Sequence, residues 1–205
     1  KGYALTISFP HSNMGYTQAF PSQNQECLLE GMKRIFEHMG GVPPRLRFDN
    51  MTTAVAQVLR GTERSLTDGF SRFMLHYRFQ AEFCNPASGN EKGNVENKVG
   101  YSRRNFLVPP PRFMELSGYN SRLLTEADSD MDREHYHYDQ TILERFGEDK
   151  KALLPLPDVA FDPARYETVL TDKWGRFTLE KGKHEYSVSP DHVCTNVWLK
   201  ITSRR

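Results

Sequence analysis

The sequence predicts an α/β protein with a mixed sheet and flanking helices, followed by a helical linker and a small β-barrel. Two observations carry this prediction. Up to about residue 107, short runs of β-forming residues alternate with segments whose apolar residues recur at helical spacing. From Tyr166 onward, short alternating strands are separated by Gly-containing turns, which is typical of small barrels. The 205 residues are enough for one or two domains.

The first elements are a β-hairpin and a helix. Residues 3–9 alternate in polarity, and residues 16–20 return after a turn-forming stretch. Ser22 and Gln25 have the spacing of a capping box, which predicts the start of a helix there. Gly40-Gly41 predicts its end.

Two further strands are predicted at residues 45–48 and 79–84, with a helix between them that carries Phe70, Phe73 and Tyr77. A helix between two strands implies a crossover, so part of the sheet is predicted to be parallel. Residues 51–65 fit neither pattern clearly. A last helix, up to about residue 107, completes this part of the chain.

Proline-rich breaks divide the chain into three predicted domains. Pro109–Pro111 ends the α/β core, residues 1–108, and Pro155 with Pro157 ends a helical linker, residues 109–157. The barrel occupies residues 158–205, and it has too few strands to close. Because the chain starts inside a strand and without Met, we expect it to be a fragment of a longer protein.

Charge is distributed unevenly, although the formal net charge is only +1. Residues 92–112 carry five Lys or Arg and one acidic residue, whereas residues 126–149 carry nine Asp or Glu and two Arg. This asymmetry suggests one surface for a polyanion and an acidic surface for protein contacts. Two solvated helix faces of opposite sign would give the same pattern.

Cysteine usage and hydropathy point to the cytoplasm. The three cysteines form no CxxC pair, and we expect Cys27 and Cys84 to be buried thiols in a reducing compartment. No apolar stretch approaches 18 residues, so no membrane span is expected.

Two carboxylates are the strongest candidates for chemistry. Asp49 directly follows a predicted strand, and Glu96 lies on the basic helix after residue 92. Carboxylates that converge from different elements can hold two Mg²⁺ or Mn²⁺ ions about 3.5–4 Å apart for phosphoryl transfer. Judged by residue type alone, an Asp at a strand end is more often a cap or turn residue.

The blocks Arg47-Phe-Asp-Asn50, Asn85-Pro86 and Lys92-Gly-Asn-Val-Glu96 resemble those of DDE transposases of the retroviral-integrase type. Residues 2–9 and 36–43 are similar to the IstA-type bacterial insertion-sequence transposases, and the similarity continues through residues 149–157 into the barrel. The resemblance implies an RNase H-like integrase core over residues 1–108.

The resemblance further implies that Asp49 is the second catalytic acid and metal ligand, and that Glu96 is the third. Their separation of 47 positions exceeds the usual spacing in the family, which leaves Glu91 as an alternative third acid. Residues 1–48 contain no Asp, and their Glu residues lie on the first predicted helix. We therefore expect the first acid to precede Lys1, and this chain to be inactive alone.

DNA is the substrate and partner that the resemblance implies, as transposon ends and as target. Four cations would bind its backbone phosphates, namely Lys92, Lys98, Arg103 and Arg104. Asn50 and Asn85 would position a DNA end, although turn residues need no such role. A second copy of the chain and a separate AAA+ helper ATPase are the expected protein partners.

Three functions remain in competition. The leading hypothesis is a transposase that cuts at element ends and joins them to target DNA. The alternatives are a non-catalytic DNA-binding or assembly module derived from a transposase, and an RNase H-like nuclease. Two side predictions concern other residues: His135 and His137 lie on opposite sides of a helix and make a poor metal pair, and Trp174 and Trp198 belong to the barrel core.

Overall fold

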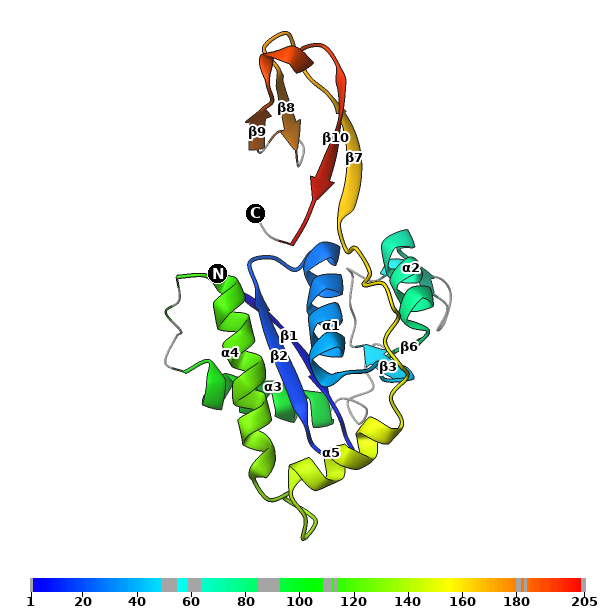
Figure 1. Ribbon diagram of the computed structural model, residues 1–205, viewed down its shortest axis with the longest axis vertical. Coiled ribbons are helices and arrows are strands. Elements are labelled where there is room, and N and C mark those ends of the chain that lie inside the picture. Colours follow the sequence, from blue (N-terminus) through cyan, green and yellow to red (C-terminus); the bar gives the residue numbers. More distant parts are fainter. Residues whose placement is uncertain are drawn as a thin grey trace. The chain divides into compact units, whose positions relative to one another are not determined.

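The computed structural model of the chain describes residues 2–48, 55–58, 64–84, 93–108, 112, 114–179, 182 and 184–203 (Figure 1). For residues 55–58, 64–65 and 93–96 it describes the backbone alone. The chain divides into two compact units, Lys1–Asp162 and Pro163–Arg205. The domain boundaries expected at residues 108 and 157 stay predictions.

The first unit is a mixed α/β structure, as the sequence predicts. Its elements are β1 (Tyr3–Ser8), β2 (Gly15–Phe20), α1 (Gln25–Met39), β3 (Arg45–Phe48), β4 (Val55–Val58), β5 (Arg64–Leu66), α2 (Asp68–Tyr77), β6 (Gln80–Phe83), α3 (Gly93–Phe106), α4 (Leu116–Ser129), the 3-10 helix η2 (Asp130–Asp132) and α5 (Ile142–Lys151). The predicted order is confirmed up to α3, with one addition. Strands β4 and β5 pair as an antiparallel hairpin in the segment that the sequence left ambiguous.

The β1–β2 hairpin is covered on both faces. Its antiparallel register places Leu5 opposite Gln18 and Thr6 opposite Thr17, so alternate pairs point to opposite sides. On one side α1 approaches so closely that a Cβ at Gly31 would lie 2.7 Å from Leu5 Cδ2. On the other side α3 packs against β1 (Figure 1). Both faces of β2 are therefore buried.

A parallel strand pair forms the second sheet of this unit. Strands β3 and β6 align from Arg45 opposite Gln80 to Phe48 opposite Phe83, and α2 lies between them in the sequence. This confirms the predicted crossover. Phe48 stacks on Phe83 with 5.5 Å between ring centroids, so the carboxyl ends of both strands are anchored in the core.

The core of the first unit is rich in aromatic rings. Among the described residues, six of them are fully buried: Tyr16, Phe36, Phe70, Phe73, Tyr77 and Phe146. Residues from the predicted linker, such as Ala127 on α4 and Ile142 on α5, belong to the same core cluster. Helices α4 and α5 are therefore packed parts of this unit.

Hydrogen bonds of Asn120 join helix α4 to the edge of β2. The Asn120 amide Nδ2 donates to Ala19 O at 2.9 Å, and the Ala19 amide donates to Asn120 Oδ1 at 2.7 Å. Gln18 Nε2 also donates to the backbone oxygen of Asn120 at 3.0 Å. The Asn120 side chain thus pairs with the free backbone amide and carbonyl at the edge of β2, as a neighbouring strand would.

Two local predictions were wrong. The cap of α1 is Asn24, whose side chain accepts from the Cys27 amide, and not Ser22; the helix starts at Gln25 because the Asn24 side chain reaches the third amide of the first turn. The helix predicted over residues 123–138 ends at Ser129, and residues 133–140 are not helical. His135 and His137 therefore do not lie on a helix.

The second unit consists of antiparallel strand pairs. Strand β7 (Arg165–Leu170) pairs with β10 (Asn196–Ile201), and β8 (Arg176–Leu179) pairs with β9 (His184–Ser187), with the 3-10 helix η3 (Pro190–His192) between β9 and β10. All four strands lie where the sequence predicts them.

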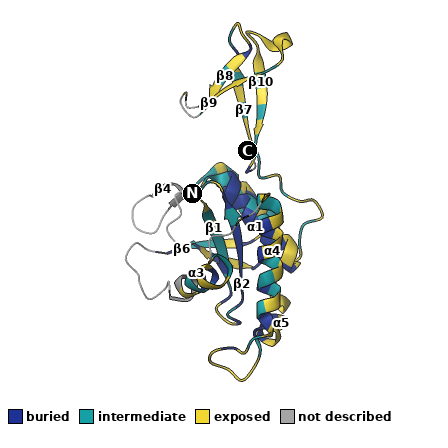
Figure 2. Ribbon diagram, turned by 90° about the vertical axis from the view of Figure 1, so that its left-hand side faces the viewer, coloured by how far each residue is buried: buried dark blue, intermediate teal, exposed yellow. Residues whose placement is uncertain are grey.

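The predicted burial of the two tryptophans was wrong. Trp174 is 66% exposed and Trp198 is 77% exposed, and Figure 2 shows mainly exposed residues along these strands. Trp198 projects from the face of β10 that carries Asn196 and Lys200, whereas the alternate residues are only half-buried. The described strands of this unit pair two by two, so they provide no second layer for the large rings.

Two further expectations concern cysteines and membrane spans. Cys27 and Cys84 are buried free thiols, as predicted, and Cys194 is exposed. Among the described residues, no helix is long and apolar enough to cross a membrane.

Candidate nucleic-acid interface

The expected acidic site involves the residues that follow β3 and β6 in the sequence and the start of α3. Asp49 directly follows β3, whose last residue, Phe48, is buried and paired with Phe83. Because parallel strands end at the same edge of a sheet, the segments after β3 and β6 leave from neighbouring points. The predicted residues Asp49, Asn50, Asn85 and Lys92, and the alternative acid Glu91, lie outside the described residues.

Helix α3 carries the third predicted acid. Glu96 lies in the first turn of α3, where the structure describes the backbone but not the side chain. In the part of the chain whose side chains are described, no group of three or more His, Cys, Asp or Glu residues could hold a metal ion.

The basic residues of α3 fall into two environments. Arg103 and Arg104, in the last turn, are exposed. Lys98, by contrast, is only 3% exposed, and its Nζ donates to the backbone oxygen of Asn13 at 3.0 Å. The proposed phosphate contacts of these residues remain predictions, but Lys98 is engaged inside the protein in a way that the two arginines are not.

The β1–β2 turn is shaped to receive Lys98. Asn13 has a left-handed backbone (φ 58°), which Asn tolerates better than most residues and which belongs to the turn that contains the accepting carbonyl. A Cβ at Gly15 would lie 2.6 Å from Lys98 Cε, so only glycine leaves room for the lysine stem.

Lys98 sits in an electropositive setting. Burial and, to a smaller extent, the neighbouring Arg133 charge lower the pKa of its ammonium group to about 8, whereas Asp130 acts in the opposite direction. Asp130 also accepts from the Tyr101 hydroxyl at 2.6 Å and from Arg133 Nε at 3.0 Å. Burial and this hydrogen bond raise the pKa of Tyr101.

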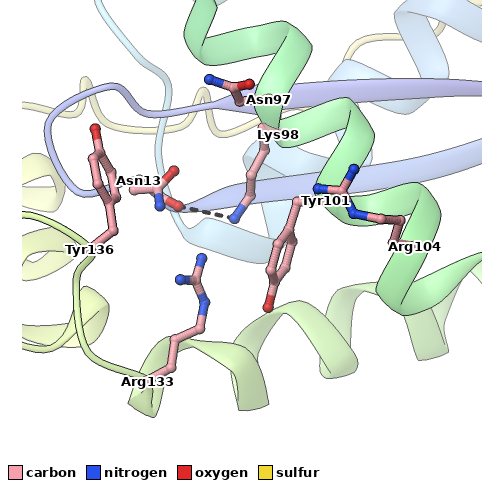
Figure 3. A pocket seen from close by; sticks show the side chains of 7 residues that line it. All are labelled: Asn13, Asn97, Lys98, Tyr101, Arg104, Arg133 and Tyr136. Carbon is pink, nitrogen blue, oxygen red and sulfur yellow. Dashed lines mark hydrogen bonds between the residues drawn. The ribbon is translucent and has the colours of Figure 1, made fainter.

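A pocket of about 330 Å³ opens beside this cluster (Figure 3). Its walls combine three cations, two tyrosines and two amides: Lys98, Arg104, Arg133, Tyr101, Tyr136, Asn13 and Asn97. They come from α3, from the β1–β2 turn and from the segment after η2. Figure 3 shows Arg133 pointing toward the end of Lys98, with Tyr101 between Lys98 and Arg104. Such a lining suits a ligand that combines negative charge with a flat ring.

Sequence reasoning found only part of this pocket. Lys98 and Arg104 were predicted to bind DNA, and Tyr101 between them is recognisable from its spacing of three residues to each side on one helix face. Nothing in the sequence connects Arg133 or Tyr136 with α3. Only the tertiary structure brings these residues together, because they lie in different segments of the chain.

Comparison of the sequence with known proteins gives relatives that are named transposases. No family model matches the chain. The chain is 38% identical over 153 residues to the transposase for insertion sequences IS1326/IS1353 of Pseudomonas aeruginosa, covering 74% of this chain and 30% of that protein. It is 30% identical over 199 residues to the transposase for insertion sequence element IS21 of the same species, covering 94% and 50%. A transposase of Aminobacter aminovorans is 40% identical over 122 residues, covering 57% and 24%.

These relatives place the chain among the transposases. Within that class it is related to the insertion-sequence transposases, and the IstA type that the sequence blocks resemble fits the IS21 relative. The resemblance to insertion-sequence transposases seen in the sequence is thereby confirmed. The chain spans half or less of the length of each of these relatives.

Proposed function

We propose that this chain is part of a DDE transposase, which cuts DNA at transposon ends and joins the ends to target DNA. The observation that carries the proposal is the combination of transposase relatives with the positions of two acids in the sequence, next to described elements. In the sequence Asp49 directly follows β3, which pairs in parallel with β6, and Glu96 lies in the first turn of α3. The proposal includes an RNase H-like core in the first unit and a barrel that includes the second.

In this proposal Asp49 and Glu96 hold Mg²⁺ or Mn²⁺ together with an acid outside residues 1–48. The donor set fits such an ion, because carboxylate oxygens are the ligands that Mg²⁺ prefers. When bound, a pair of ions would supply activation of the nucleophile and charge stabilisation at the leaving oxygen. Water would attack the phosphodiester and release a 3′-hydroxyl, which would then attack the target strand without a covalent protein intermediate.

The described residues supply DNA affinity in this proposal. Arg103 and Arg104 are exposed on α3 and can reach backbone phosphates. Lys92, Asn50 and Asn85 would act beside them near the acids. Lys98 would act from a buried position, with its ammonium group held at 3.0 Å from the Asn13 carbonyl, and so would shape the surface rather than reach far into solvent.

The test is strand transfer in a full-length transposase that contains these residues. We expect Asp49→Asn and Glu96→Gln each to lower Mn²⁺-dependent strand transfer at least about 100-fold, the upper end of the loss seen even for outer-shell partners of a metal. Asp158→Asn, at an exposed aspartate far along the chain, is the matched control. Glu91→Gln separates the two candidates for the third acid.

Other outcomes would overturn the assignment. Unchanged strand transfer in both acid variants would favour a non-catalytic module. Degradation of DNA without transposon ends would favour an RNase H-like nuclease.

We also propose a second copy of the chain and an AAA+ helper ATPase as partners, on the basis of the IstA-type resemblance. The acidic segment 126–149 is only partly free for such contacts. Asp128 accepts from Tyr16, and Glu148 lies 2.9 Å from His11 Nε2. Asp132, Glu134 and Asp139 are exposed. Reversing these three charges should weaken helper-stimulated transposition if this surface is the contact, and unchanged stimulation would exclude it.

A further inference from the structure

The pocket beside α3 contains more positive charge than the described side chains around it neutralise. Three cations line it, namely Lys98, Arg104 and Arg133. Among the described residues, Asp130 is the carboxylate that pairs with one of them, through Arg133 Nε at 3.0 Å. Arg104 has no ion-pair partner in that part of the chain. A ligand with a negative charge would complete this cluster.

Two of these cations, Lys98 and Arg133, are held in place before any ligand arrives. The Arg133 guanidinium lies 4.7 Å from the centre of the Tyr101 ring, and Lys98 Nζ lies 5.0 Å from it. The hydroxyl of the same ring donates to Asp130. Because these contacts fix the side chains, little conformational entropy remains to be lost when an anion binds.

The pocket also offers a flat apolar surface and amide groups. Tyr136 is 73% exposed, and its ring stacks on His135 with 4.6 Å between centroids. His135 is itself buried, so it supports the exposed ring from behind. Asn13 and Asn97 place side-chain amides, which both donate and accept hydrogen bonds, on the same pocket (Figure 3).

We propose that this pocket seats a single nucleotide of a DNA strand, with its phosphate held by Arg104 and Arg133 and its base against the Tyr136 ring. The proposal rests on the proposed function, because it takes DNA as the substrate. It adds the position at which the protein holds one unpaired nucleotide. Arginine pairs with phosphate through two parallel hydrogen bonds. Aromatic rings stack on bases of any sequence.

Size and chemistry favour a nucleotide over other anionic ligands. A volume of about 330 Å³ lies at the small end of ligand pockets, so it fits one nucleotide and excludes a stacked base pair. A base must therefore leave its stack to enter, as in enzymes that extrude a nucleotide. An acidic side chain of a protein partner would use the cations but would leave the Tyr136 ring and the two amides without a role.

The experiment measures binding of a fluorescein-labelled single-stranded DNA oligonucleotide to this chain by fluorescence anisotropy in EDTA. We expect Arg104→Gln and Tyr136→Ala each to raise Kd about tenfold, as expected for one lost phosphate contact or one lost stacked base. Tyr136→Phe keeps the ring and should bind as the wild type does. Arg72→Gln, which removes an exposed charge from α2, should change Kd less than about twofold.

A second arm identifies the bound unit. With an oligonucleotide made entirely of abasic sites, Tyr136→Ala should lose its effect, while Arg104→Gln should keep it. Competition by free deoxyadenosine monophosphate at millimolar concentration tests whether a separate nucleotide occupies the pocket as well as a nucleotide within a strand. Inorganic phosphate in the same assay reports the contribution of the anion alone.

Wild-type Kd values in both Arg104→Gln and Tyr136→Ala would overturn the proposal, and so would an equal effect of Tyr136→Ala on intact and abasic strands. If these two variants lost binding to a polyglutamate peptide while their binding to DNA stayed unchanged, the pocket would be a site for an acidic protein segment instead. The assay contains no divalent metal and does not depend on Asp49 or Glu96. A negative result in this assay therefore does not contradict the proposed strand-transfer chemistry. A negative result in the strand-transfer test likewise does not contradict nucleotide binding in the pocket.

Discussion

The two compact units differ in the burial of their aromatic residues. In the first, Phe73 is fully buried and contacts the rings of Phe36, Tyr77 and Phe161. In the second, Trp198 is the most exposed of several large apolar side chains on the strands. The sequences of both units alternate apolar and polar residues, so alternation alone does not produce a core.

The difference lies in what covers the strands. Helices α1 and α3 cover the two faces of the β1–β2 hairpin, and α4 occupies the edge of β2. Among the described residues after Pro163, no α-helix lies on a strand. Two-stranded ribbons are marginally stable by themselves. Helix docking is thus what turns strand alternation into a packed core, and the following variants test this explanation.

The largest expected effect separates the two units directly. Phe73→Ala should lower the free energy of unfolding of the first unit by about 3–5 kcal/mol, because it leaves a cavity among buried rings. Trp198→Ala, at an exposed ring, should cost less than about 1 kcal/mol. Urea denaturation followed by circular dichroism measures both. Equal costs in the two variants would contradict the contrast between the units.

The next effect concerns the docking of α4. Asn120→Ala should cost about 2–3 kcal/mol, because the Ala19 amide and carbonyl lose their partners at a partly buried edge. Ser121→Ala, at the exposed neighbouring position, should cost less than about 0.5 kcal/mol. Hydrogen exchange of the Ala19 amide should accelerate only in the Asn120 variant. Unchanged exchange would mean that the Asn120 side chain does not protect the edge of β2.

A third variant tests the approach of α3 to the hairpin. Gly15→Ala should destabilise the chain by about 1–3 kcal/mol, because the new Cβ would lie 2.6 Å from Lys98 Cε. Gly118→Ala is the matched control, because nothing lies within 4 Å of a Cβ there and alanine favours the helix by up to about 1 kcal/mol. Thermal unfolding should shift in opposite directions. A stabilising Gly15→Ala would show that Lys98 can leave its buried position freely.

The smallest effect depends on pH. Burial, together with the charge and hydrogen bond of Asp128, raises the pKa of Tyr16 well above its ordinary value. The folded state therefore keeps the phenol protonated, so its stabilisation is complete below pH 10 and is lost as the pH rises beyond about 10. Tyr16→Phe should cost about 1 kcal/mol at pH 7 and reduce the loss of stability above pH 10.

Denaturation profiles between pH 7 and 11 measure this effect. Tyr186→Phe, at an exposed ring of the second unit, is the matched control for removing one phenol. An alkaline loss of the same size in Tyr16→Phe and in the wild type would show that the Tyr16 contact with Asp128 does not set the alkaline limit.

Element order was predictable because it depends on local patterns. The first strand of the hairpin was located from alternation, the second from the turn before it, and the crossover through α2 followed from a helix lying between two strands. Caps were less predictable. Ser22 and Asn24 are both good capping residues, and only the folded backbone decides which side chain reaches a free amide. Likewise, the helical pattern of residues 123–138 did not reveal the break after Ser129.

The candidate site was predictable only in its linear part. The sequence blocks around Asp49 and Glu96 indicated a transposase, and the relatives agree. Periodicity placed Lys98 on α3 beside two arginines but could not show that Lys98 turns inward. That outcome depends on Asn13 and Gly15, 85 and 83 positions earlier, which provide an acceptor and a space without a side chain.

By itself, the sequence determined the mixed α/β class, the order of the strands and helices of the first unit, and the relationship to insertion-sequence transposases. These features depend on short-range periodicity and on ordered residue blocks, which any chain displays before it folds. The tertiary structure decided which charges are buried and which face a ligand. It brought Arg133 and Tyr136 to α3 and left Trp198 exposed, because burial depends on which elements pack together, and that choice is made between residues far apart in the chain.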